Sequence, residues 1–69
     1  MEAQELDKRF MHHPPKGDQQ ERYIKVRAAF RELAEVINEL CPESREKSVA
    51  FTELETAQFW ANAAIARNE

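Results

Sequence analysis

The segment YIKVRAAFRELAEVINELCPES, residues 23–44, combines a regular apolar pattern with the proline that interrupts it. A set of apolar residues recurs in steps of three and four, the heptad spacing of a helix that packs along one stripe. These residues are Tyr23, Val26, Phe30, Leu33, Ile37 and Leu40. The pattern predicts a long helix over about 19–41, and Pro42 then stops it or opens the next helix.

A second long helix is predicted over about 44–67, with Ser44 as a suitable N-terminal cap. A stripe of mostly small residues runs along it, at the same alternating steps, and would let a partner helix approach closely. The stripe consists of Ala50, Leu54, Ala57, Ala61 and Ala64. Because the link between the two helices is short, they should form an antiparallel hairpin.

The N-terminal segment, about 2–11, is predicted to be a short helix, since Leu6 and Phe10 are four positions apart. Two prolines and the only glycine, all within 14–17, separate it from the long helices. The expected fold class is therefore all-α, a single domain over residues 1–69. It comprises a short helix followed by an antiparallel helical hairpin, assembled into a homo-oligomer.

The expectation of an oligomer comes from the apolar residues that one hairpin cannot cover. A chain of 69 residues has little core of its own, and a single cysteine, Cys41, allows no disulfide within the chain. Several apolar residues of the C-terminal helix do not all fit one stripe: Val49, Phe51, Phe59, Trp60 and Ile65. They are either loosely covered surface residues or, as we expect, buried against other copies of the chain.

Charge is distributed unevenly along the middle helix. Residues 8–31 contain seven basic and two acidic residues, whereas 32–43 contain four glutamates and no basic residue. Asp18 is expected to cap this helix, with Glu21 completing a capping box. The antiparallel hairpin would bring Arg67 near Arg22 and Arg27, gathering cations that suit phosphate. The alternative is a solvated face with helical ion pairs such as Arg31–Glu35.

No catalytic or metal-binding constellation is evident. His12 and His13 are adjacent, so their side chains point in different directions and make poor joint ligands. Cys41 has no base at a suitable spacing, and a chain with one glycine has no phosphate-binding glycine loop. We therefore expect a binding protein that is not an enzyme, without catalytic residues, metal or cofactor. The net charge of −3 argues against DNA or RNA as partner, and no apolar run is long enough for a membrane span.

Two strings, HHPPKGDQQERYIKVR (12–27) and CPESREKSVAFTELETAQFWANAAIAR (41–67), resemble the phage helical-hairpin family of cyclic-nucleotide sponges. Its members include the anti-CBASS sponge and the hairpin part of the Thoeris anti-defence sponge. The resemblance implies a protein of the infected bacterial host's cytoplasm that sequesters cyclic dinucleotides, or also cyclic trinucleotides, without cleaving them. It further implies a homohexamer with pockets between protomers.

The resemblance also implies site residues. His13 matches a family histidine before the Pro-Lys-Gly-Asp-Gln run, while His12 stands where the family often has an aromatic residue. Arg27, or else Lys25, matches a phosphate-pairing residue of the middle helix, and Arg67 matches a closing arginine. The full set of candidate ligand-binding residues is His12, His13, Lys16, Lys25, Arg27, Asn62 and Arg67.

Two other functions remain open from the residues alone. The alternative is a helical oligomerisation module that binds a protein partner through the apolar residues that the hairpin leaves uncovered. A phosphodiesterase is the third hypothesis, which the lack of a metal-ligand set disfavours.

Overall fold

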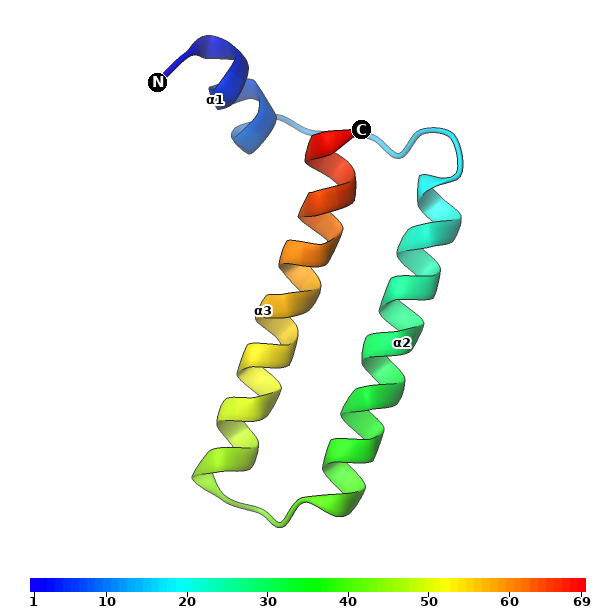
Figure 1. Ribbon diagram of the computed structural model, residues 1–69, viewed down its shortest axis with the longest axis vertical. Coiled ribbons are helices and arrows are strands. Elements are labelled where there is room, and N and C mark those ends of the chain that lie inside the picture. Colours follow the sequence, from blue (N-terminus) through cyan, green and yellow to red (C-terminus); the bar gives the residue numbers. More distant parts are fainter.

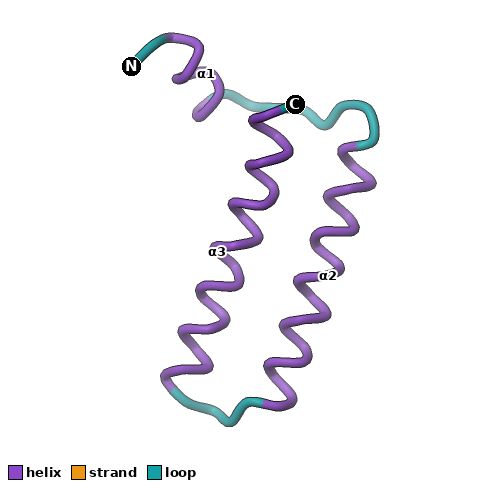
Figure 2. Tube along the Cα trace, in the orientation of Figure 1, coloured by secondary structure: helices purple, strands orange, loops and turns teal.

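The computed structural model describes residues 1–69 and contains three α-helices and no strand. Helix α1 spans Ala3–Phe10, α2 spans Gln19–Leu40 and α3 spans Arg45–Asn68. Helices α2 and α3 run antiparallel, and α1 lies beside the end of α3, on the side away from α2 (Figure 1). The loop of residues 11–18 crosses the end of α3 to reach α2 (Figure 2). The predicted all-α hairpin is confirmed.

The closed end of the hairpin is fixed by polar contacts at the Pro42 turn. The Ser44 hydroxyl accepts a hydrogen bond from the Lys47 amide at 3.1 Å, so Ser44 is the N-cap that the sequence predicts. Lys47 is buried, and its ammonium donates to the Asn38 carbonyl at 3.0 Å and to Glu43 at 2.5 Å. The Lys47 side chain thus supplies a hydrogen bond to a carbonyl in the last turn of α2 and links α2 to the start of α3.

The Ser44 cap has a measurable consequence for stability. Ser44→Ala removes the acceptor for the Lys47 amide and should lower the free energy of unfolding by about 1 kcal/mol. Ser48→Ala is the matched control, because the exposed Ser48 hydroxyl donates only to the main-chain carbonyl of Ser44 and accepts from no amide of the first turn. Urea unfolding at one fixed protein concentration measures both. Equal stability of the two variants would contradict the assignment of Ser44 as the cap.

Asp18 occupies the predicted N-cap position of α2, but the predicted side-chain cap is wrong. Its side chain makes no capping hydrogen bond, and its carboxylate instead accepts from Arg22 Nε at 3.1 Å. Asp18 follows Gly17, which has a φ of +56°, and has φ −90° and ψ 10°, unlike the extended backbone typical of a capping residue. The Gln19 side chain stabilises this turn, because its Oε1 accepts from the Lys16 amide at 3.1 Å.

The contact between α2 and α3 follows each predicted stripe only in part. On α2, Leu33 and Leu40 of the predicted stripe are exposed. On α3, Ala57 and Ala64 are exposed, whereas Phe51, Gln58 and Ile65 are half-buried. A strict heptad drifts by about 20° per repeat from a straight α-helix, so over 24 residues the contact line moves to other positions. The later part of the contact therefore uses larger and more polar side chains than the predicted alanines.

The single chain has almost no core. No apolar residue is fully buried, and the molecule measures 46 × 29 × 13 Å, so it is one helix thick. Large apolar side chains are exposed on all three helices, among them Phe10, Leu33, Leu40, Phe59 and Trp60. No helix combines the length and the hydrophobicity that a membrane span requires.

Candidate functional site

Two grooves lie at the open end of the hairpin, where α1, the 11–18 loop, the start of α2 and the end of α3 meet. The α1–α3 groove has a volume of about 620 Å³ and the loop groove about 690 Å³, both within the range of small-molecule sites. Lys8 and Arg67 line both grooves. The two grooves are therefore neighbouring parts of one surface.

The α1–α3 groove combines aromatic rings with cations. Phe10 and Trp60 line it together with Lys8, Arg9 and Arg67. The Arg67 guanidinium lies 6.0 Å from the centre of the Trp60 ring, and its Nη2 donates a 3.4 Å hydrogen bond to the Arg9 carbonyl. Since Arg9 is paired with a glutamate of its own helix at 2.9 Å, Lys8 and Arg67 are the cations of this groove that have no acidic partner.

The loop groove lies beneath the proline-containing segment. His13 Nε2 donates a hydrogen bond to the Lys8 carbonyl at 2.8 Å, and this contact holds the loop against α1. In the neutral ring the proton is then on Nε2, so Nδ1 can accept a hydrogen bond. Lys8, Lys16 and Arg67 contribute positive charge to the groove, and Asp7 and Glu69 contribute negative charge. Its polar lining complements the aromatic lining of the α1–α3 groove.

The open end of the hairpin is less basic than its sequence predicts, because Glu69 neutralises part of it. Arg22 binds both carboxylate oxygens of Glu69, one of them at 2.8 Å, and Gln19 Nε2 donates to the same group at 3.2 Å. Lys16 Nζ donates to the main-chain oxygen of Glu69 at 2.6 Å. We call Lys16, Gln19, Arg22 and Glu69 the Glu69 clasp. Glu69, like Arg67, lies at this end because α3 runs antiparallel to α2.

The clasp changes the acid–base properties of its members. Hydrogen bonds from Arg22, and then from Gln19, lower the pKa of the Glu69 carboxyl to about 2. The same hydrogen bond to Glu69, with Asp18 nearby, raises the pKa of Arg22 above its ordinary value. Both groups are therefore charged throughout the physiological range.

The lowered pKa of Glu69 predicts a pH-dependent contribution to stability. Because the folded-state pKa lies below the ordinary value of 4.5, the contribution is complete above about pH 5 and is lost as the pH falls towards 2. Urea midpoints across this range should fall more steeply for the native chain than for Glu69→Gln, by a small amount, since the clasp is exposed. Glu53→Gln is the control, because Glu53 lies on the same helix without an ion pair. Parallel profiles for the native chain and Glu69→Gln would contradict the clasp.

The structure brings three of the seven predicted site residues together: His13, Lys16 and Arg67 all line the loop groove. Lys25 and Arg27 are exposed on α2 and line neither groove. His12 is likewise exposed and outside both. Two residues that sequence reasoning did not select as ligand-binding, Lys8 and Phe10, line a groove. Their position just before the break at residues 11–18 is the signal that would have indicated them.

The predicted proximity of Arg67 to Arg22 and Arg27 is wrong. Arg67 contacts the Arg9 carbonyl and approaches Trp60, so it faces α1, and Arg22 is paired with Glu69 instead. Arg67 and Glu69 point in different directions because residues two positions apart are separated by about 200° around a helix, at 100° per residue. The acidic residue, not the basic one, therefore faces α2.

Asn62 occupies an unusual position in α3. The side chain is half-buried, and its Oδ1 atom is shielded from solvent without a hydrogen-bond donor. An unsatisfied buried acceptor costs about 1–3 kcal/mol. Asn62 lines neither groove, so this structure gives it no direct place in a ligand site.

The comparison with protein families gives a match that covers nearly the whole chain. The family described as Acb2/Tad1, hairpin domain, matches residues 1–66. The chain belongs to this family. The Acb2/Tad1 hairpin is a binding domain with a sponge-type anti-defence role, and the resemblance seen in the two sequence strings is thereby confirmed. No curated protein and no solved structure gives a significant match. Arg67 lies one residue beyond the matched range.

Proposed function

We propose that this protein binds cyclic oligonucleotide second messengers and sequesters them without cleavage, so that CBASS effectors of the infected bacterium are not activated. Membership of residues 1–66 in the Acb2/Tad1 hairpin family carries this proposal. Cyclic dinucleotides such as cGAMP are the primary ligands, with cyclic trinucleotides as a further class, and the protein acts in the host cytoplasm as a binding protein, not an enzyme.

The open end of the hairpin offers the groups that such a ligand needs. A cyclic dinucleotide presents two flat bases and two phosphodiesters with one negative charge each. Phe10 and Trp60 provide exposed rings, and base stacking on an aromatic side chain contributes about 1–3 kcal/mol. Lys8 and Arg67 provide cations without acidic partners beside those rings. Retention of the ligand therefore requires stacking and charge, without any reading of base sequence.

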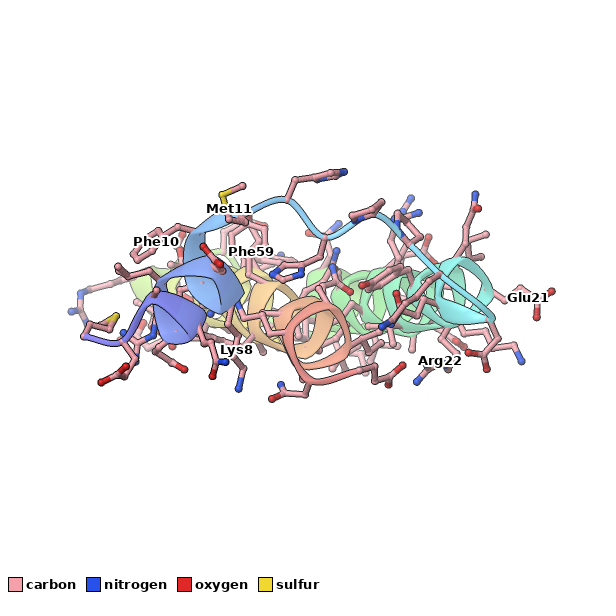
Figure 3. All side chains as sticks on the ribbon, turned by 90° about the horizontal axis from the view of Figure 1, so that it is seen from above. Lys8, Phe10, Met11, Glu21, Arg22 and Phe59 are labelled. Carbon is pink, nitrogen blue, oxygen red and sulfur yellow. The ribbon has the colours of Figure 1, made fainter.

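A second copy of the chain is part of the proposal. Each groove is open, and the single chain leaves large apolar side chains uncovered. Seen from the open end, Phe10, Met11 and Phe59 lie towards one face of the flat molecule, and Lys8 and Arg22 towards the other (Figure 3). We expect the apolar face to pack against other protomers of a homohexamer. His12, Lys25, Arg27 and Asn62 would then complete the grooves from neighbouring copies.

A ligand panel tests the proposed function. Calorimetric titration of the assembled protein with cyclic di- and trinucleotides should give saturable binding of at least one of them. The ligand should be recovered chemically intact after the protein is denatured. The absence of binding to every compound in a correctly assembled oligomer would refute the proposal, and recovery of a cleaved ligand would support a phosphodiesterase.

The exposed aromatic residues also favour a second candidate function, an oligomerisation module that binds a protein partner. Phe59 and Trp60 are about two-thirds exposed, as expected for anchors of a protein interface. This alternative predicts that Trp60→Ala disrupts a complex that Arg27→Ala leaves intact. The sponge function instead predicts that cyclic nucleotide binding depends on cationic residues in addition to the aromatic ones.

A further inference from the structure

The Glu69 clasp places a carboxylate among donors that would equally suit a phosphate group. Arg22 Nη1 and Nη2 donate to different carboxylate oxygens of Glu69, as a guanidinium does in bidentate recognition. Gln19 adds an amide donor to one of those oxygens, and Lys16 brings its ammonium to the same residue. Two side chains thus converge on the Glu69 carboxylate, and a third, Lys16, binds the main-chain oxygen of the same residue.

The charge of the clasp matches a monoanion with two acceptor oxygens. The side chains of Arg22 and Lys16 carry two positive charges, and those of Glu69 and of Asp18, which is paired with Arg22, carry two negative charges. These four side chains are therefore neutral together when Glu69 is in place. Withdrawal of Glu69 leaves one net positive charge. A phosphodiester has one negative charge over two non-bridging oxygens, so it would restore neutrality and fit the same guanidinium fork.

The carboxylate is also in a position to leave. The side chains of Arg22 and Glu69 are 36% and 39% exposed, and exposed ion pairs contribute little to stability. Glu69 follows the last helical residue of α3, so its movement requires no rearrangement of the hairpin. Lys16, Gln19 and Glu69 all line the loop groove, and withdrawal of Glu69 would therefore enlarge that groove and make it more basic.

We propose that Arg22, Lys16 and Gln19 form an oxyanion site that Glu69 occupies in the ligand-free protein and that a phosphodiester of the ligand takes over by displacing it. Glu69 is then an internal competitor that lowers the affinity of this site for the phosphodiester. The identity of the ligand as a cyclic oligonucleotide rests on the proposed function, whereas the preference of the site for a phosphodiester monoanion rests on the clasp alone.

The direct test uses dimethyl phosphate, a minimal phosphodiester, followed by NMR at the Arg22 Nε–H signal. The signal should respond in Glu69→Gln at a concentration about two- to fivefold lower than in the native chain, the factor equivalent to one exposed ion pair. Lys16→Gln in the Glu69→Gln background should weaken the response. Trimethyl phosphate, which is neutral, should give none, and Glu53→Gln should behave as the native chain.

The outcome separates this proposal from the proposed function. No response at Arg22, or the same response in the native chain and Glu69→Gln, overturns the oxyanion site even where cyclic nucleotides bind the protein. Competition between dimethyl phosphate and Glu69, in a protein that binds no cyclic nucleotide, supports the oxyanion site and refutes the sponge. Circular dichroism of each variant confirms that the helices are retained.

Discussion

Replacement of Arg67 by alanine should weaken cyclic nucleotide binding by about 10- to 100-fold and leave the helices intact. Arg67 lines both grooves, lies near the Trp60 ring, and makes no ion pair within the chain. A hydrogen bond to a charged group contributes about 1.5–3 kcal/mol, which corresponds to that loss of affinity. Since Arg67 lies in the last turn of α3 and forms only one long hydrogen bond, folding should change little.

Calorimetry on the native chain and three variants isolates the role of the Arg67 guanidinium. Arg67→Lys keeps the positive charge but loses the fork, so it should bind with intermediate affinity. Arg45→Ala is the matched control, because it removes an exposed arginine of the same helix at the opposite end of the hairpin. Equal affinity of Arg67→Ala and Arg45→Ala would contradict the placement of phosphate at Arg67.

Phe59→Glu should dissociate the assembly. Phe59 is 65% exposed in the single chain, lines neither groove, and lies on the same face as Phe10 and Met11. Burial of a phenylalanine contributes about 1.5–3 kcal/mol, and a glutamate at this position would place a charge in the interface. The dissociation constant of each interface should rise by at least about tenfold.

Light scattering at several protein concentrations measures this change in mass. Gln20→Glu is the control, since it adds the same charge at an exposed polar position, and it should leave the mass unchanged. Phe59→Leu should retain the oligomer because an apolar side chain remains. A native chain that is monomeric throughout, or a Phe59→Glu variant of native mass, would contradict burial of this face.

The hairpin was predictable because its signals are local. The heptad spacing from Tyr23 to Leu40, the break at Pro42 and the Ser44 cap each depend on neighbouring residues, and together they leave one arrangement for α2 and α3. The alanine stripe on α3 was less reliable, because a small angular drift over three heptads changes which residues face the partner helix. Local patterns thus predict elements better than they predict facing side chains.

The candidate site was predictable only in part, because it depends on contacts between residues far apart in the chain. Sequence reasoning correctly placed Arg67 at the open end of the hairpin but overlooked Glu69 two residues later. It also missed the groove that α1 forms with α3, since nothing in 2–11 indicates on which side of the hairpin that helix lies. The net charge of the site therefore emerged only from the three-dimensional arrangement.

Native mass spectrometry of the protein mixed with a cyclic dinucleotide tests the central claim most directly. One spectrum reports the number of protomers and the number of bound ligands. Collisional activation in the same experiment releases the ligand, so that its mass is measured. We predict an oligomer that retains the ligand at its unaltered mass. An oligomer that retains none of the cyclic nucleotides tried, or a ligand whose mass has increased by one water, would contradict it.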